Sequence, residues 1–142
     1  MCSKFFWGLA LGAVLAGTAL PAAAIETQTL LSSDHTIVGE QVVYPSGPAK
    51  ITGIIATFAP GESTAWHTHG IPEFGYMLEG ELTVDYGDKG KRVYRAGDSV
   101  LEAIHAPHKG TNTGSVPARV LVVYMGAEGV PTSRPAADPN GK

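Results

Sequence analysis

Apolar and polar residues alternate in short runs from residue 25 onward, and clusters of glycine and proline separate these runs. No stretch beyond residue 24 has the period of an amphipathic helix. Roughly ten short strands with turns between them are typical of an all-β sandwich or barrel. The expected strands span residues 25–33, 40–44, 50–58, 73–79, 81–87, 91–97, 99–103, 108–112 and 118–126.

The run from Lys50 to Phe58 differs from the others because both of its faces are largely apolar. Side chains on a strand point alternately to its two faces. One face carries Ile51, Gly53, Ile55 and Thr57, and the other carries Ile54, Ala56 and Phe58. A strand of this kind is expected to be buried on both sides. One face would line the interior, and the other would meet a second layer or a partner subunit.

Length and charge narrow the class of protein. The chain has 142 residues, which is enough for a single domain with a leader. Its formal charge is −3, and lysine and arginine do not cluster anywhere in the sequence. A surface for binding nucleic acid is therefore not expected.

Residues 1–24 have the three parts of a secretory signal peptide. A lysine is followed by an apolar run over residues 5–20, and then by small residues up to Ala24 that suit a cleavage site. The alternative is a membrane anchor, but this run is shorter than the roughly 20 residues that span a bilayer. We expect an exported protein, periplasmic or secreted, without a stable membrane anchor.

Cleavage after Ala24 would leave a domain over residues 25–126 and a proline-rich tail over residues 127–142. The single cysteine, Cys2, lies in the leader, so the remaining 142 − 24 = 118 residues could form neither a disulfide nor a thiolate ligand. The tail has three prolines and little apolar content, which predicts an extended arm or a disordered segment.

Candidate metal ligands gather between residues 61 and 80. His67 and His69 are two residues apart, so a strand would place both imidazoles on one face. Glu73 follows a Gly-Ile-Pro break and can add a carboxylate from the next strand. A fourth candidate, His108, comes just after a proline farther along the chain.

Both stretches resemble the two sequence motifs of the cupin superfamily, in particular its small, single-domain, quercetin-dioxygenase-like members. The first motif, G-x5-H-x-H-x3-E-x6-G, is matched at every fixed position: Gly61, His67, His69, Glu73 and Gly80. The second, G-x5-P-x-G-x2-H-x3-N, is matched at Gly97, His108 and Asn112. It departs from the pattern in the turn before the histidine, where Ala103 replaces proline and His105 replaces glycine.

The resemblance implies a double-stranded β-helix, the jelly-roll barrel of cupins, with one divalent transition metal held by His67, His69, Glu73 and His108. Three neutral imidazoles and one carboxylate suit such an ion and leave positions open for water or substrate. Fe, Mn, Cu, Ni and Zn all remain candidates. Loading outside the cytosol would favour copper and zinc. Many cupins pair, so the resemblance also points to a homodimer.

Glu102 is the candidate catalytic residue. If it shares the inward face of its strand with Val100, its carboxyl group could reach a metal-bound water as a general base or acid. The alternative is a carboxylate at the solvent-exposed rim. His105 has the same two interpretations.

Three functional hypotheses follow from these residues and the resemblance. The first is a metal-dependent, dioxygenase-like oxidoreductase acting on a small organic molecule. The second is a non-catalytic cupin that binds a metal or ligand and needs no acid or base. The third is a zinc-dependent isomerase or lyase, which consumes no oxygen. Oxygen uptake would separate the first hypothesis from the other two.

The first testable prediction concerns export. We expect a mature protein that begins at Ile25 and is released in soluble form, because residues 1–24 match a cleavable signal peptide. Mass spectrometry of protein from its native compartment measures this directly. An intact Met1, or a lipid attached to Cys2, would contradict it.

Overall fold

The structure is a computed structural model that describes residues 24–141, so the leader expected at residues 1–24 lies, except for Ala24, outside the described residues. Nearly all of its regular structure is β. The strands are β1 (Ala49–Phe58), β2 (His67–Thr68), β3 (Glu73–Glu79), β4 (Glu81–Asp85), β5 (Lys91–Arg95), β6 (Ser99–Leu101), β7 (Lys109–Thr111), β8 (Ala118–Ala127) and β9 (Arg134–Pro135), and a short 3₁₀ turn, η1 (Gly87–Lys89), joins β4 to β5. The predicted all-β class is confirmed.

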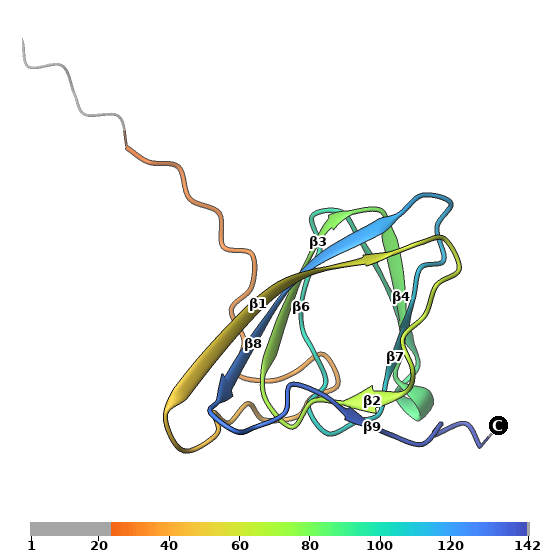
Figure 1. Cartoon of the computed structure of the whole chain (residues 1–142). Coiled ribbons are helices and arrows are strands. Elements are labelled where there is room, and N and C mark those ends of the chain that lie inside the picture. Colours follow the sequence, from red (N-terminus) through yellow and green to blue (C-terminus); the bar gives the residue numbers. More distant parts are fainter. Residues whose placement is uncertain (1–23, 142) are drawn as a thin grey trace, which may run out of the picture.

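Three antiparallel sheets build the domain. One has four strands in the order β1-β8-β3-β6, the second has three in the order β5-β4-β7, and the third pairs β2 with β9. The two larger sheets stand on opposite sides of the domain, and the β2-β9 pair crosses one end (Figure 1). Among the described residues, no helix is long and apolar enough to cross a membrane.

The alternation of the sequence explains which side chains enter the core. In β3, β4 and β8 every second residue is buried over most of the strand. Residues of both larger sheets therefore meet in one cluster. Its buried members are Met77, Leu82, Val84, Tyr86, Tyr94, Ala103, Ala118, Val120 and Val122.

Gly80 makes the tight turn from β3 into β4. Its φ is 74°, in the region that glycine adopts freely, and a Cβ atom there would lie 2.6 Å from the carbonyl oxygen of Pro117. The glycine that closes the first motif therefore has a steric reason. It lets the chain pass from one large sheet to the other.

β1 corrects one expectation. Ile54, Ala56 and Phe58 face the interior, so one face of the strand lines it as predicted, but Ile51 and Ile55 on the other face are 62% and 51% exposed. The cause is position, because β1 is an edge strand that pairs with β8 alone. Burial under a second layer of the same chain is therefore wrong. Burial by a partner subunit stays a prediction.

Two expected strands do not form. Residues 25–33 carry no β pairing, and from residues 40–44 a single bridge joins Gln41 to His35. Residues 34–42 instead fold back on themselves, with the Thr36 amide donating to the Glu40 carbonyl and the Val42 amide to the Asp34 carbonyl. Alternation in these runs is not matched by a neighbouring strand, and a strand needs that neighbour to persist.

Candidate metal centre

Backbone pairing brings His67 and His108 together. The His67 amide donates to the His108 carbonyl, and the His108 amide donates to the His67 carbonyl, both at 3.0 Å. Their ring centroids are 4.4 Å apart. His69 lies just past β2, and its ring centroid is 5.0 Å from that of His67 and 4.9 Å from that of His108. The structure therefore gathers three histidines from two distant stretches of sequence.

Each of the three rings has its Nδ1 atom at a backbone carbonyl. His67 Nδ1 is 2.8 Å from the Ala65 oxygen, and His108 Nδ1 is 3.0 Å from the Ala106 oxygen. His69 Nδ1 is 2.8 Å from the oxygen of Thr132. A carbonyl only accepts, so each Nδ1 carries the proton, and each neutral ring then has a lone pair on Nε2.

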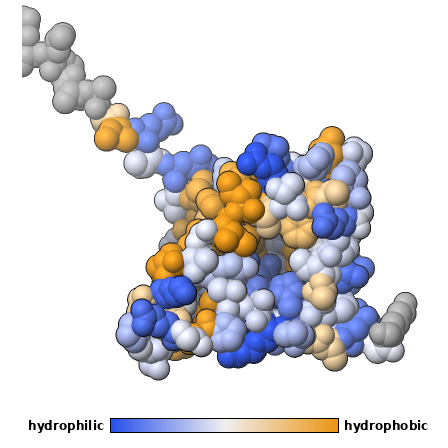
Figure 2. All heavy atoms as spheres, in the orientation of Figure 1, coloured by the Kyte–Doolittle hydropathy of each residue, from blue (hydrophilic) through white to orange (hydrophobic). Residues whose placement is uncertain are grey.

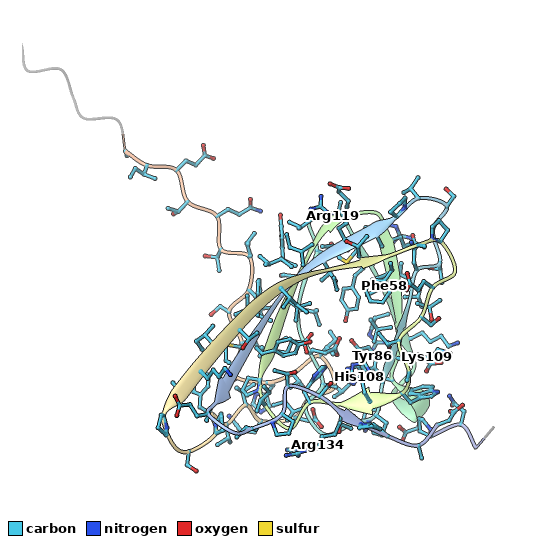
Figure 3. The ribbon with its side chains drawn as sticks, viewed as in Figure 1. Phe58, Tyr86, His108, Lys109, Arg119 and Arg134 are labelled. Carbon is cyan, nitrogen blue, oxygen red and sulfur yellow. The ribbon has the colours of Figure 1, made fainter. Side chains whose placement is uncertain are left out.

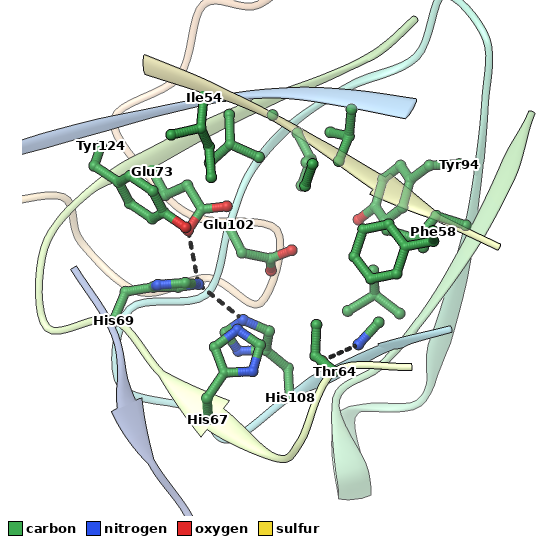
Figure 4. Close-up of a pocket in the computed structure, with 18 residues that line it drawn as sticks. Ile54, Phe58, Thr64, His67, His69, Glu73, Tyr94, Glu102, His108 and Tyr124 are labelled. Carbon is green, nitrogen blue, oxygen red and sulfur yellow. Dashed lines mark hydrogen bonds and ion pairs between the residues drawn. The ribbon is translucent and has the colours of Figure 1, made fainter. Parts of the chain in front are cut away.

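These lone pairs face one another in a small space. One nitrogen from each of the three rings lies within 4.8 Å of those of the other two, and His69 Nε2 is 3.1 Å from His108 Nε2 (Figure 4). His69 and His108 are each 2% exposed. Lone pairs at this separation repel one another unless a proton or a metal cation lies between them. The three histidine nitrogens therefore suit a divalent metal ion.

Glu73, the first residue of β3, lies beside this triad. Its Oε2 atom is 2.7 Å from His69 Nε2, yet it is fully buried and makes no well-formed hydrogen bond. A buried carboxylate oxygen without a donor is costly. A metal ion at the three Nε2 atoms would supply the missing positive charge. Glu73 thus lies where the sequence expects a fourth ligand, but it contacts one histidine rather than all three.

The surroundings move the histidine pKa values in opposite directions. Burial lowers the pKa of His108 to about 4, and burial also lowers the pKa of His67. For His69, burial acts downward as well, but the adjacent Glu73 carboxylate outweighs it and raises the pKa. Two of the three rings are therefore held neutral, as metal ligands must be, and His69 is the ring that takes up a proton first as the pH falls.

A cavity of about 140 Å³ opens beside the histidines, and Glu102 forms part of its wall. Glu102 is 6% exposed, and its Oε1 atom accepts a hydrogen bond of 2.7 Å from the Ala103 amide. Burial raises the pKa of Glu102 to about 7. The structure thus places this carboxyl group inside the cavity rather than at the rim (Figure 4).

The other residues considered from the sequence lie away from the triad. His105 is exposed, and His35 is an exposed residue whose Nδ1 atom lies 2.8 Å from Asp34. Trp66, Phe74 and Tyr76, which alternate with the ligands, are half-buried and do not line the cavity. Asn112, the last residue of the second motif, is 1% exposed and donates to the carbonyls of Phe58 and Val116.

Glu40 is a residue that the sequence reasoning missed. Its carboxylate accepts hydrogen bonds from three successive backbone amides, those of Ile104 (2.6 Å), His105 (2.9 Å) and Ala106 (2.9 Å). Burial alone would raise the pKa of Glu40, but these three donors outweigh it and hold the pKa below its usual value. They organise the turn in which Ala103 and His105 replace the motif's proline and glycine.

This turn is coupled directly to two of the histidines. The Ile104 carbonyl accepts from the His69 amide at 3.0 Å, and the Ala106 carbonyl accepts from His108 Nδ1. Glu40 therefore fixes the peptides that orient His69 and His108. The departure from the second motif was the one sequence signal that another group must hold this turn.

Thr132 is the second contribution that sequence reasoning missed. Its carbonyl fixes the His69 ring, and the Ala136 amide donates to the Trp66 carbonyl at 3.0 Å. β9 pairs with β2 in the same region. The proline-rich tail is thus extended and lies against the site (Figure 1). Every residue has a backbone carbonyl, so no local sequence pattern could identify Thr132 as the partner of His69.

Comparisons with known proteins agree with this geometry. Residues 54–124, half of the chain, match the cupin domain family. No curated protein matches the sequence. The chain belongs to the cupin family, and the jelly-roll fold class predicted from its motifs is confirmed.

Solved structures share the fold at low sequence identity. The oxalate decarboxylase of Lactobacillus farciminis has 23% identity and a TM-score of 0.52, over 60% of this chain and 26% of that one. The DMSP lyase of Ruegeria pomeroyi has 22% identity and a TM-score of 0.54, over 62% and 44%. A Klebsiella pneumoniae protein with a double-stranded β-helix domain has 19% identity and a TM-score of 0.53, over 75% and 89%. The match spans less than half of the two enzymes.

The second prediction concerns the triad. Replacing His67, His69 or His108 with alanine should lower metal affinity by at least about tenfold, because each removes one of three converging lone pairs. The thermal stabilisation by added metal should shrink in parallel, since an ion bound to the folded state alone stabilises it. Metal titration followed by calorimetry and melting measures both. His35→Ala and His105→Ala are matched controls, and loss of metal from either would contradict the assignment.

The third prediction concerns Glu40 as a positioning residue. Glu40→Gln keeps one acceptor oxygen but sets an amide N–H against a backbone donor, so the turn at residues 104–106 should loosen. We expect metal affinity to fall by about tenfold. Affinity is compared with the melting temperature of the metal-free protein, which a general folding defect would lower equally. The exposed Glu128→Gln is the control. Unchanged metal affinity in Glu40→Gln would show that the turn holds without it.

Proposed function

We propose that this cupin is a metal-dependent enzyme that acts on a small organic molecule as a dioxygenase-like oxidoreductase. The observation that carries the proposal is the placement of Glu102. Its buried carboxyl group lines the same cavity as His67, His69 and His108. Three candidate metal ligands and a candidate proton-transfer group thus line one cavity, which is the arrangement that acid–base chemistry on a bound substrate requires.

The three Nε2 atoms, with Glu73 beside them, would hold one divalent ion. Fe, Mn, Cu, Ni and Zn all accept such ligands, so the ion stays open within this set. When bound, the metal would supply Lewis acidity toward a substrate oxygen and, if it is iron, manganese or copper, redox chemistry with dioxygen. Three histidines and one carboxylate leave coordination positions free for substrate.

Glu102 would move the substrate proton. A carboxyl group with a pKa of about 7 is divided between its two protonation states near neutral pH, so it can accept a proton and return it. Two buried tyrosines, Tyr86 and Tyr94, have their hydroxyl groups 3.0 Å apart, and Tyr94 lines the same cavity as Glu102. Burial raises the pKa of both phenols, so they remain protonated near neutral pH and leave Glu102 as the group that exchanges protons.

The isomerase or lyase hypothesis is the second candidate, and the same residue favours it. Such reactions move a proton between carbon and a base without consuming oxygen, and Glu102 could accept and return that proton for a substrate held beside the histidine triad. A non-catalytic binder explains Glu102 less well. Burying an ionisable carboxyl group is unfavourable, and orienting a ligand needs only a neutral hydrogen-bonding group, whereas moving a proton needs one that titrates.

Location and assembly belong to the same proposal. Export, periplasmic or secreted, rests on the leader at residues 1–24. A homodimer through the outer face of β1 rests on the apolar side chains exposed there, chiefly Ile51 and Ile55 with Val43 and Tyr44 nearby. Apolar atoms gather along the region where β1 runs in the space-filling view (Figure 2).

The fourth prediction tests Glu102. Glu102→Gln should lower kcat by about a hundredfold or more, because it removes the proton acceptor, while metal content stays unchanged. In the parent protein, a step that uses the Glu102 carboxylate as base should speed up as pH rises through about 7, since the deprotonated form increases there. Oxygen uptake and product formation with one-ring phenols measure both.

Glu62→Gln serves as the control, since Glu62 accepts a hydrogen bond from the Ala59 amide in its own turn and does not line the cavity. Product formation without oxygen uptake would replace the oxidoreductase with the isomerase or lyase. Full activity in Glu102→Gln would contradict the proposed role.

A further inference from the structure

We infer that the cavity selects a substrate of about one ring in size that is uncharged in solution and largely apolar, and that it rejects dianions. This inference rests on the proposed function, because it concerns the same cavity. Three features support the inference: the volume of the cavity, the chemistry of the side chains that line it, and the positions of the lysine and arginine residues.

The volume sets the size of the ligand. The cavity measures about 140 Å³. An engineered apolar cavity of about 150 Å³ is known to take up one benzene molecule. A single six-membered ring with a small substituent therefore fits. The cavity is open to solvent beside Ile54, which is 41% exposed, so the second ring of a fused two-ring molecule would extend out of the cavity and gain less apolar contact.

The wall is mostly apolar. Six branched or aromatic side chains from strands of both large sheets supply much of it: Ile54, Phe58, Leu82, Val100, Val120 and Val122. Ile54 and Phe58 lie across the hollow from the histidine rings (Figure 4). These side chains give an apolar ring its contact surface, while the histidine end receives the polar substituent.

Thr64 can orient that polar substituent. Its Oγ1 atom accepts a hydrogen bond from the Gly110 amide at 3.1 Å, so the hydroxyl proton is free to donate to a substrate oxygen. Glu102 offers an acceptor for a substrate hydroxyl in the same wall. One hydroxyl group on the ring could therefore accept a hydrogen bond from Thr64 and donate one to Glu102.

Charge excludes dianions. None of the lysine and arginine side chains within residues 24–141 lines this cavity, whereas Glu73 and Glu102 do. Arg134 borders an adjoining hollow that shares Thr64, His67 and Tyr124 with the cavity, but its side chain does not line the cavity itself. Arg119 lies toward the opposite end of the domain from His108 (Figure 3). A divalent ion beside the Glu73 carboxylate would leave one net positive charge, and none when Glu102 is ionised. The second negative charge of a dianion would therefore be buried without a partner.

The test measures ligand binding to the metal-loaded full chain by calorimetry, with phenol, 2-naphthol and oxalate as probes. Phenol should bind about tenfold or more tightly than either of the others. 2-Naphthol should bind weakly because of its size, and oxalate because of its second charge. Tighter binding of oxalate than phenol, equal binding of 2-naphthol, or no phenol binding at millimolar concentration would overturn the inference.

A second experiment introduces a positive charge into the cavity wall. Ile54→Lys places an ammonium group in the cavity wall at a position that is already 41% exposed, so folding should tolerate it. Oxalate should then bind about tenfold more tightly than in the parent, and phenol more weakly. Ile51→Lys is the matched control, because it adds the same charge on the outer face of β1.

An increase in oxalate affinity in both variants would mean that net charge, not the cavity, decides, and would overturn the inference. The result is separable from the proposed function. Phenol that binds but is never turned over would remove the enzyme proposal and leave the selectivity intact. Oxygen consumption with a dianionic substrate that binds more tightly than phenol would support the enzyme proposal and overturn the proposed selectivity.

Discussion

The constraint on which the site depends is the repulsion among buried imidazole lone pairs and a buried carboxylate oxygen, which only a proton or a cation between them relieves. Three backbone carbonyls, of Ala65, Ala106 and Thr132, each accept a hydrogen bond from the Nδ1 atom of one histidine. These bonds orient the rings so that each Nε2 atom points inward. The Glu73 oxygen that meets them is buried without a hydrogen bond. Left alone, this arrangement is unfavourable. It becomes favourable when a cation occupies the centre, which ties the stability of the fold to metal binding.

The positions of the candidate metal ligands could be predicted from local periodicity and motif spacing. His67 and His69 were expected to share a face because they are two positions apart, and Glu73 begins β3 as expected. His108 joined them through its motif, and the structure shows the reciprocal backbone bonds that place it opposite His67. The inward face of β1 followed from the same alternation. These features depend on short-range geometry, which a sequence records directly.

Features that depend on distant partners were not predictable in this way. The runs at residues 25–33 and 40–44 alternate like strands, but no neighbour pairs with the first, and the second forms one bridge. The outer face of β1 is exposed because the strand lies at an edge, which alternation does not reveal. Thr132 acts through its carbonyl, so its side-chain identity carries no signal. Each of these wrong or missing predictions reflects the presence or the absence of a long-range contact, which local alternation does not record.

The altered turn of the second motif shows how a distant residue can replace local rigidity. The family pattern stiffens this turn with proline and glycine, whereas here Glu40 gathers the amides of residues 104–106 from outside. The same peptides orient His69 and His108. Metal binding and the docking of residues 34–42 therefore stabilise the same conformation of one turn. By linkage each must strengthen the other, so a segment remote in sequence becomes part of the metal centre.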